Sequence, residues 1–404
     1  METVLVVSYH FPPEESSCSE KNIRLVKLLL DNGYKVVVLT KPGQGEFSFT
    51  NENLILLRTS SAGMFHKQVG SASCSTPSAT PRNIKTKIKK WISLNVIPDG
   101  TVDWYIPAKK TINENSELLS KTDIILSISS PYSAHFVSHY ASKKFKIPYI
   151  MSYGDPWIYE PKRRRGWFRY PLEKYLEARL LRDSSKVLLI TEWNKRKYQE
   201  LYNLPSEKVM TFNIGYDNDN VLDILPVKSD KYRILYGGSL DPVHRDPQPF
   251  LEAMQKIDNV ESYIYCNDNP SIDSLINKYN IDDRVFHQPL IKSSEFNRLM
   301  YDFDALLLFG NKTPFQVPGK VFTYIAAKKM IIYIKNNDFP DDGTEEVLKK
   351  YGNMIIVHNN SDDIVNCLTA ITKEGKSIES KPEVFEYHNT MKSTISAIED
   401  VLGE

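Results

Sequence analysis

The sequence predicts an α/β protein built from two doubly wound parallel sheets. Short runs rich in Val, Ile and Leu alternate with longer segments of helical period. This alternation stops at a polar stretch, residues 217–230, and then starts again. The chain has 404 residues, enough for two or three domains of ordinary size.

The first series of elements occupies residues 4–214. Residues 4–9 indicate a buried strand, and the following helix carries Ile23, Val26 and Leu29 on one face. Further strands are expected at 35–40, 123–129, 149–153, 186–191 and 208–214, and further helices at 134–144, at 171–182 and up to about residue 202. This order is typical of a parallel sheet covered on both faces.

The second series begins after the polar stretch. Its strands are expected at 232–236, 263–266, 285–288, 305–309, 330–334 and 354–357. Two domains of similar size, residues 1–214 and 215–384, are therefore expected to join near Gly215. Residues 385–404 no longer alternate with strands. We expect a helix there that packs back across the junction and completes the first domain.

The composition excludes several classes of protein. With 41% apolar and 25% charged residues, the chain is not mainly disordered. A net charge of +1 provides no global field for nucleic acid, and no apolar run approaches a membrane span. The four cysteines are too far apart for a zinc site or a disulfide framework, and no secretion signal is evident. We expect a cytoplasmic protein with no nucleic-acid partner.

The loop after the first strand, residues 9–19, is the first candidate for ligand binding. Small residues, Ser16 and Ser17 among them, would let the backbone approach a phosphate at a helix start. The same residues are typical of a helix cap after the rigid Pro12-Pro13 turn. Because the loop lacks the glycines of a dinucleotide-binding fingerprint, its sequence leaves both interpretations open.

A second candidate lies at the end of the first strand of the second series. Gly237, Gly238 and Ser239 form a turn that permits close approach of a ligand to the backbone. Arg245 follows just before a helix, where a guanidinium can meet a diphosphate. A plain strand-to-helix turn with a solvated arginine is the alternative, and we favour the binding turn.

Gly319 and Lys320 form a third candidate at the expected start of a helix. A cation at a helix N-terminus opposes the helix dipole and is unfavourable unless an anion binds nearby. Lys320 is therefore the most informative residue of the second half. A solvated surface lysine is the weaker alternative.

Asp155, in the run SYGDPW after a predicted strand, is a fourth candidate because its carboxylate can accept a proton or a hydroxyl hydrogen bond. An Asp-Pro pair is more often only a turn.

Metal signals are weak, since the D-x-D spacings at 217–219 and 302–304 stand alone and no HxxxH spacing occurs. Neither a GxSxG motif nor a P-loop is present, so hydrolase and P-loop kinase hypotheses have little support.

Taken together and in this order, the motifs resemble those of GT-B glycosyltransferases, in particular the family-four-like group that builds bacterial surface polysaccharides of the capsule or cell wall. The matching segments are VLVVSYHFPP near the start, PD at 98–99, WYIPA from Trp104, SISSPYSAH from Ser127, SYGDPW, LLITEW, NIGYD from Asn213, YGGSLDPVHRDPQPFLEAM and GKVFTYIAAKK. Each motif is unspecific alone, but their order along nearly the whole chain makes the set fairly specific.

This resemblance implies two Rossmann-like domains facing a cleft. It implies transfer of a hexose from a nucleotide sugar to an acceptor hydroxyl, with retention at the anomeric carbon. The donor would bind mainly to residues 215–384, and a lipid-linked or growing surface glycan mainly to 1–214. Arg245 and Lys320 would hold the diphosphate and stabilise the leaving group without a metal. The nucleotide sugar is then a substrate, and no cofactor is implied.

The same resemblance assigns further site residues. The residues implied to bind the donor are Ser16, Ser17, Gly237, Gly238, Ser239, Gly319 and Tyr324. The residues implied on the acceptor side are Tyr9, Pro131, His135 and Trp157. Asp155 would lie near the acceptor or the donor sugar and take part in catalysis.

The chain departs from the family pattern at the paired glutamates. The family often has two glutamates separated by seven residues around the GKVFTY segment, whereas Thr323 stands at the second position here and Phe315 eight residues before it. The first loop also lacks its usual glycines. The alternative hypothesis is therefore a non-catalytic GT-B protein that scaffolds an active glycosyltransferase. A nucleotide-sugar epimerase is a third, which the SYGDPW and PD motifs do not favour.

Two basic segments, residues 82–92 and 162–169, suggest a membrane contact. The first is amphipathic and carries a Trp, and the second reads KRRRGWFR. A basic amphipathic helix can lie in an anionic membrane interface, where each basic residue adds roughly 1 kcal/mol. We expect peripheral attachment to the inner face of the plasma membrane; a solvated helix and loop are the alternative.

Overall fold

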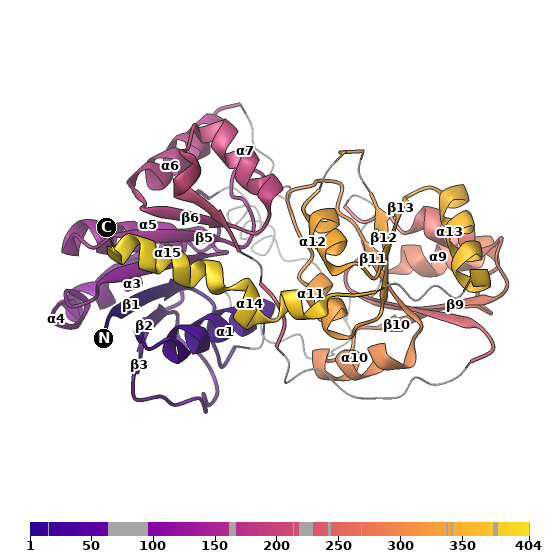
Figure 1. Cartoon of the computed structure of the whole chain (residues 1–404), viewed down its shortest axis with the longest axis horizontal. Coiled ribbons are helices and arrows are strands. Elements are labelled where there is room, and N and C mark those ends of the chain that lie inside the picture. The colour runs from indigo at the N-terminus through magenta and orange to yellow at the C-terminus, as the bar shows by residue number, and fades with distance from the viewer. Residues whose placement is uncertain are drawn as a thin grey trace, which may run out of the picture. The chain divides into compact units, whose positions relative to one another are not determined.

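Two parallel β-sheets, one of seven strands and one of six, organise the computed structural model (Figure 1). The structure describes residues 1–14, 16–63, 96–160, 167–212, 214–217, 229–240, 244–267, 269–336, 338–340, 342–374 and 379–403. The chain divides into unit 1, Met1–Phe212 with Met391–Glu404, and unit 2, Asn213–Thr390. The predicted α/β class with two doubly wound parallel sheets is confirmed.

Unit 1 contains the seven-stranded sheet, in the order β3-β2-β1-β4-β5-β6-β7. The strands are β1 (Thr3–Ser8), β2 (Lys35–Thr40), β3 (Leu54–Arg58), β4 (Ile124–Ser129), β5 (Tyr149–Tyr153), β6 (Lys186–Leu189) and β7 (Val209–Thr211). Continuous apolar runs such as that of β1 suit a strand buried on both faces. The strand order reverses between β1 and β4, where parallel sheets of this kind leave room for a ligand.

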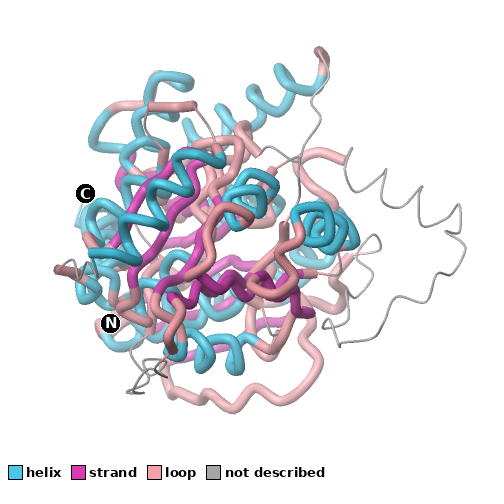
Figure 2. Tube along the Cα trace, turned by 90° about the vertical axis from the view of Figure 1, so that its right-hand side faces the viewer, coloured by secondary structure: helices cyan, strands magenta, loops and turns pink. Residues whose placement is uncertain are grey.

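Helices alternate with these strands along the chain and complete unit 1. Figure 2 distinguishes the helices, strands and loops of the chain by colour. The helices of unit 1 are α1 (Ser17–Asp31), α3 (Tyr105–Glu114), α4 (Ser116–Leu119), α5 (Ser133–Phe145), α6 (Arg169–Asp183), α7 (Glu192–Tyr202) and α15 (Lys392–Gly403). The last of these returns from the end of the chain and packs beside β6 and β7.

Unit 2 contains the six-stranded sheet, in the order β10-β9-β8-β11-β12-β13. The strands are β8 (Tyr232–Gly237), β9 (Val260–Cys266), β10 (Val285–Pro289), β11 (Ala305–Phe309), β12 (Met330–Lys335) and β13 (Met354–His358). The helices are α8 (Gln248–Met254), α9 (Pro270–Tyr279), α10 (Ser293–Leu299), α11 (Lys320–Ala326), α12 (Gly343–Tyr351), α13 (Ser361–Glu374) and α14 (Tyr387–Thr390). The order reverses between β8 and β11.

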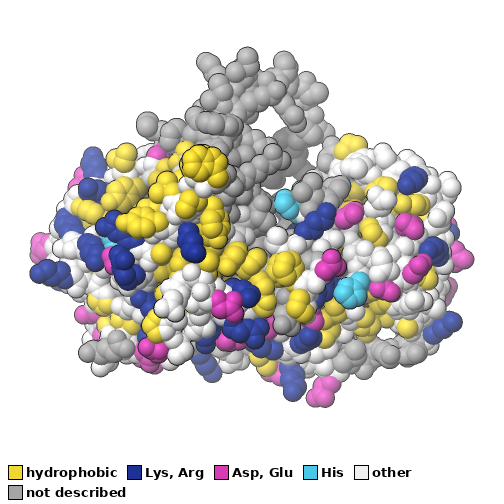
Figure 3. Space-filling model, turned by 90° about the horizontal axis from the view of Figure 1, so that it is seen from above, with side chains coloured by type: hydrophobic (Ala, Val, Ile, Leu, Met, Phe, Trp, Pro, Cys, Tyr) yellow, Lys and Arg dark blue, Asp and Glu magenta, His cyan; other side chains and the backbone are white. Residues whose placement is uncertain are grey.

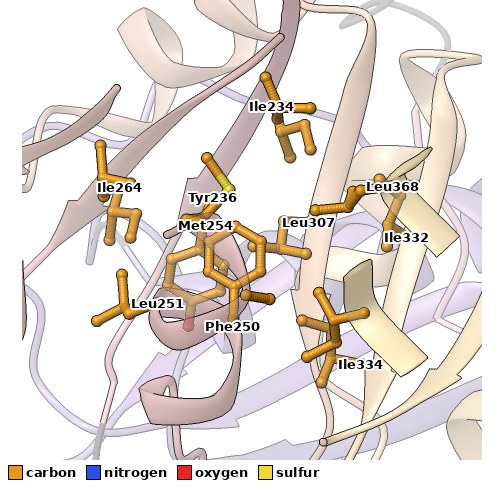
Figure 4. Packing of buried hydrophobic residues seen from close by; sticks show 14 of the residues in the cluster. Ile234, Tyr236, Phe250, Leu251, Met254, Ile264, Leu307, Ile332, Ile334 and Leu368 are labelled. Carbon is orange, nitrogen blue, oxygen red and sulfur yellow. The ribbon is translucent and has the colours of Figure 1, made fainter. Parts of the chain in front are cut away.

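One face of the second sheet packs against α8, α9 and α13. Side chains from the strands, such as Ile234 and Leu307, meet Phe250 and Met254 of α8 and Leu368 of α13 (Figure 4). All of these are buried. This core fixes the carboxyl ends of β8 and β11, and therefore the loops that follow them.

The last segment differs from the single helix predicted for residues 385–402. A 3₁₀ helix, Pro382–Phe385, is followed by α14 and then by α15. The break occurs because Tyr216 pairs with this stretch: its amide donates to the Phe385 carbonyl at 2.8 Å, and the Tyr387 amide donates to the Tyr216 carbonyl at 2.9 Å. Glu386 is held extended, and the chain enters unit 1 only at Met391 rather than at residue 385.

The sequence prediction also omitted β3 and placed the end of β7 too late. β3 is a short apolar run, LILLR, and each of its residues is half-buried. Within the described ranges, no helix combines the length and the apolar character that crossing a bilayer requires.

Candidate functional site

A pocket of about 330 Å³ opens at the carboxyl edge of the sheet in unit 2. It lies at the switch point between β8 and β11, the position where open parallel sheets bind ligands. Its walls come from the ends of β8 and β11, the loop after β10, and the turn into α11. The residues that line it are Tyr236, Gly237, Gly238, Ser239, Arg245, Leu290, Leu308, Phe309, Pro318, Gly319 and Lys320.

The turn after β8 needs glycine for two separate reasons. A Cβ built on Gly237 would lie 2.3 Å from the ring of Phe296, so no side chain fits there. Gly238 has a φ of +152°, a backbone conformation that other residues rarely adopt. The turn is further fixed by the Tyr236 hydroxyl, which donates to the Ser239 carbonyl at 3.0 Å.

Arg245 reaches the pocket from a loop that is held at several points. Its Nε donates to Oδ1 of Asn311 at 2.8 Å. The neighbouring His244 carbonyl accepts from Asn336 Nδ2 at 3.0 Å, and the Asp246 carbonyl accepts from Asn359 Nδ2 at 3.0 Å. The guanidinium therefore projects from a fixed backbone, with donors left for a ligand.

Lys320, the first residue of α11, lies opposite. Its ammonium stands 4.3 Å from the centre of the Phe296 ring, a cation–π contact. Burial and, to a smaller degree, the Arg245 charge lower the pKa of Lys320 from 10.5 to about 8. Among the described residues neither cation has an acidic partner within ion-pair distance. The pocket is thus a concentration of uncompensated positive charge.

Aromatic side chains back the two glycines. Phe296 of α10 stacks on Tyr324 with ring centres 6.4 Å apart, and the Tyr324 hydroxyl accepts a hydrogen bond from the Gly237 amide at 3.2 Å. Burial raises the pKa of the Tyr324 hydroxyl well above its usual range and that of Tyr236 to about 12, so both stay neutral. This rigid wall leaves Arg245 and Lys320 as the pocket's charged groups.

The arrangement is suited to a compact group with more than one negative charge. Two cations in a partly buried pocket attract a diphosphate much more strongly than they would in water. Within the described part of the chain, no cluster of three His, Cys, Asp or Glu side chains is placed to hold a metal ion.

Most residues predicted to bind the donor come together here. Gly237, Gly238, Ser239, Gly319 and Lys320 line the pocket with Arg245, and Tyr324 supports it from behind. Their role toward a ligand stays a prediction. Sequence reasoning missed Leu290 and Phe296, although Leu290 directly follows the end of β10, where the carboxyl-edge rule points.

Ser16 and Ser17 lie in unit 1, at the start of α1. The Ser16 hydroxyl accepts from the Ser19 amide at 3.1 Å, which is the cap that the sequence left open as one interpretation. Ser17 is exposed. Asp155 is partly exposed just beyond β5, at the same edge of the sheet.

The four residues assigned to the acceptor side lie in the core of unit 1. Tyr9, Pro131, His135 and Trp157 are all buried. The Tyr9 hydroxyl donates to the Ala62 carbonyl at 3.0 Å, and His135 Nδ1 lies 2.7 Å from the Ser127 hydroxyl. Burial lowers the pKa of His135 to about 3, so it is neutral. Buried side chains of this kind shape the loops above them, and their role toward an acceptor stays a prediction.

The basic segments are only partly described. Residues 82–92 and 162–166 lie outside the described residues. Arg169 is not a surface cation, because it is buried and its Nε donates to Glu173 Oε1 at 2.7 Å. This corrects the expectation that the end of the second segment is a surface cation.

One of the D-x-D carboxylates makes a structural contact: Asp304 accepts a hydrogen bond from the Arg233 amide at 2.7 Å.

No protein-family model and no curated protein matches the chain. Solved structures do match it over its length. A glycosyltransferase from Rickettsia africae ESF-5 is similar with a TM-score of 0.68 at 13% identity, covering 99% of this chain and 98% of that one. Sucrose-phosphate synthase from Thermosynechococcus elongatus is similar with a TM-score of 0.64 at 13% identity, covering 100% and 95%. Anabaena HepE in complex with UDP has a TM-score of 0.61 at 10% identity, covering 100% and 99%. The likeness shows the fold: the chain has the GT-B fold.

Proposed function

We propose that the protein is a glycosyltransferase that binds the diphosphate of a nucleotide sugar between Arg245 and Lys320. The observation that carries this proposal is the pair of cations in the unit 2 pocket, neither of which has an acidic partner among the described residues. Similar structures support it, since the HepE structures contain UDP or UDP-glucose. We therefore take a uridine diphosphate sugar as the first donor to test.

The two cations would assist the chemical step as well as binding. When the bond between the sugar and the diphosphate breaks, negative charge grows on the leaving phosphate oxygen. Lys320 and Arg245 are already held in place by Phe296 and Asn311, so they stabilise that charge without reorganising. This needs no metal. Retention at the anomeric carbon, with Asp155 near the reacting sugar, belongs to the same proposal.

The proposed acceptor is a lipid-linked or growing surface glycan, met at a membrane surface. The start of α6 supports a membrane contact, because Trp167 is 91% exposed, Phe168 62% and Tyr175 64%. Hydrophobic and basic side chains gather on this part of unit 1 (Figure 3). Aromatic rings beside basic residues suit the interface of an anionic membrane.

The membrane contact is tested by flotation with phosphatidylglycerol liposomes. We expect the Trp167→Ser/Phe168→Ser double variant to lose binding. Ile106→Ser, which removes another exposed apolar side chain from unit 1, is the matched control and should float as the wild type does. Equal flotation of all three proteins would remove the membrane contact from the proposal.

The transfer activity is tested by measuring nucleotide release from UDP-glucose, UDP-galactose, UDP-N-acetylglucosamine, GDP-mannose and ADP-glucose, with and without a membrane lipid extract. We expect one donor class to be consumed, and Lys320→Met to abolish this. Lys278→Met, which removes an exposed lysine of α9, should retain it. Proton NMR of the product then shows whether the anomeric configuration is retained.

The alternative is a non-catalytic scaffold for a second glycosyltransferase. It is favoured by Thr323, which stands where the resemblance implies a glutamate, one residue before Tyr324. A scaffold would consume none of the donors and would co-purify with an active partner. Consumption of a donor by the purified protein alone excludes it.

A further inference from the structure

A second buried lysine, Lys21 of α1, lies at the carboxyl edge of the sheet in unit 1. The residue is only 6% exposed. Its ammonium reaches the end of β5, since a Cβ built on Gly154 would lie 3.4 Å from Lys21 Nζ. The lysine is therefore directed at the loop that carries Asp155 rather than at solvent.

Lys21 makes no hydrogen bond and no ion pair with any described residue. Burial lowers its pKa, while Cys18 and Asp155 act in the opposite direction from beyond contact distance. An uncompensated cation in a protein interior is costly, and an apolar side chain of the same length would cost less. The position is consistent with an anion that arrives with a ligand.

The start of α1 supplies donors at the same place. Helical side chains lean toward the N-terminus, so Lys21 extends back along the first turn toward Cys18. The Ser16 hydroxyl occupies the Ser19 amide, but the Ser17 and Cys18 amides have no acceptor among the described residues. A buried cation beside the positive end of a 15-residue helix is doubly unfavourable until an anion is present.

The other nearby carboxylate is already neutralised. Glu14 accepts from His10 Nδ1 at 3.0 Å and pairs with Lys41 Nζ at 3.1 Å, contacts that hold its pKa down at about 2 despite burial. Asp155 does not come within ion-pair distance of Lys21. Neither acid therefore occupies the position in front of the Lys21 ammonium.

We propose that Lys21 and the first amides of α1 bind an oxyanion, a phosphate or carboxylate carried by the acceptor. This deepens the proposed function and rests on it, because the donor diphosphate already has two cations in unit 2. The acceptor is thereby an anionic glycan or glycolipid. Its charged group would sit beside Asp155, which places an acceptor hydroxyl within reach of that carboxylate.

The site is tested with inorganic phosphate as the probe, in the Lys320→Met background, which weakens the unit 2 pocket. Lys21→Met is compared with Lys27→Met, which removes another lysine of the same helix. Thermal unfolding is followed in phosphate and in chloride of equal ionic strength. We expect Lys21→Met to lose the stabilisation by phosphate, with affinity lower by about tenfold to a hundredfold, and Lys27→Met to keep it.

Lys21→Met should fold, and in chloride it should unfold at or above the temperature of its parent, because it removes a buried charge. Lys21→Arg keeps the charge and should keep the response to phosphate. Equal responses to phosphate in Lys21→Met and Lys27→Met would overturn the site.

A UDP titration separates donor from acceptor, with Lys320 restored. We expect Lys21→Met to bind UDP as the wild type does. A loss of UDP affinity would mean that donor phosphates use Lys21, and would overturn the acceptor assignment. Failure of the wild type to bind UDP would contradict the proposed function, while the phosphate result at Lys21 would still stand.

Discussion

The carboxyl edges of the two sheets are built alike but carry charge differently. Each has a lysine of low exposure near the start of a helix, the half-buried Lys320 in unit 2 and the buried Lys21 in unit 1. In unit 2 a second cation, Arg245, lies close by, and none of the described residues that line the pocket is acidic. In unit 1 the neighbourhood holds Glu14 and Asp155. The same topology thus presents a site for a strongly negative group in one unit and a mixed, more nearly neutral site in the other.

The turns that follow the first strand of each sheet explain part of this difference. After β8, the lack of a side chain on Gly237 lets the Phe296 ring pack against the backbone, and Gly238 has a positive φ. After β1, Pro12 and Pro13 lead into a serine cap, and Arg58 donates to the Pro12 carbonyl at 2.5 Å. The proline loop is thus tied to the end of β3 ahead of the start of α1, whereas the glycine turn lets α10 pack against the end of β8.

The largest effect should come from removing a cation of unit 2. We expect Lys320→Met and Arg245→Met each to lower kcat/KM for the donor by about 10²–10³-fold, because they stabilise charge that develops in the transition state. The unfolding temperature should not fall, since neither side chain has an acidic partner among the described residues. Steady-state kinetics and thermal unfolding check both parts. Wild-type turnover in both variants would contradict the assigned roles.

The protonation of Lys320 should make the stability of the protein depend on pH, and this is the next largest effect. The pKa of Lys320 is about 8 in the folded state and 10.5 otherwise, so the unfolded state binds more protons between these values. Stability therefore rises with pH across this window, by roughly 2–3 kcal/mol after allowance for partial exposure. Lys320→Met should lack this rise in urea unfolding measured from pH 7 to 10.5.

The loss of the Lys320 charge should also weaken donor binding. Donor affinity should therefore fall as the pH rises, whereas stability increases. Above pH 8 the free ammonium loses its charge, so UDP affinity should fall with rising pH. Lys320→Arg keeps its charge throughout the range and should flatten the profile. A wild-type profile that is flat from pH 7 to 9.5 would show that Lys320 does not meet the diphosphate.

Alanine substitution at two glycines of the unit 2 pocket should change the stability by very different amounts. Gly237→Ala places a Cβ 2.3 Å from the Phe296 ring and should destabilise unit 2 by about 1–3 kcal/mol. Gly319→Ala meets nothing within 4 Å and should change stability by less than about 0.5 kcal/mol. Urea unfolding of both variants measures the difference, and equal effects would contradict the close packing assigned to Gly237.

A modest loss of stability is expected at the paired lysine of unit 1. Lys41→Met removes the contact with Glu14 Oε2 at 3.1 Å, so the pKa of Glu14 should rise from about 2. A carboxyl group whose pKa is lowered in the folded state stabilises the protein above its unfolded pKa. This stabilisation is lost as the pH falls toward 2. The variant should lose about 1–2 kcal/mol at pH 7, with much less loss at pH 2–3. UDP binding serves as the control and should not change.

The sequence predicted the strand–helix order because buried parallel strands leave continuous apolar runs. It missed β3, although LILL is a continuous apolar run, and the break at Glu386, which depends on pairing with Tyr216 from a distant part of the chain. Local pattern contains no information about such tertiary pairing.

The unit 2 pocket was largely predictable, since Gly237, Arg245 and Lys320 follow strand ends or begin helices. Phe296 was not, because nothing in the sequence places α10 behind the glycine turn. In unit 1, position at a strand end did not separate surface from core. The resemblance gave His135 and Trp157 a role toward the acceptor although both are buried, while Lys21 was overlooked.

The most direct test is a calorimetric titration of UDP and of uridine into the wild type, Arg245→Met, Lys320→Met and the double variant. If both cations hold the diphosphate, each single variant should lose about tenfold to a hundredfold in UDP affinity and the double variant still more. Uridine, which carries no phosphate, should bind all four proteins equally. Equal UDP affinity in the wild type and both single variants would contradict the assignment of the diphosphate to this pocket.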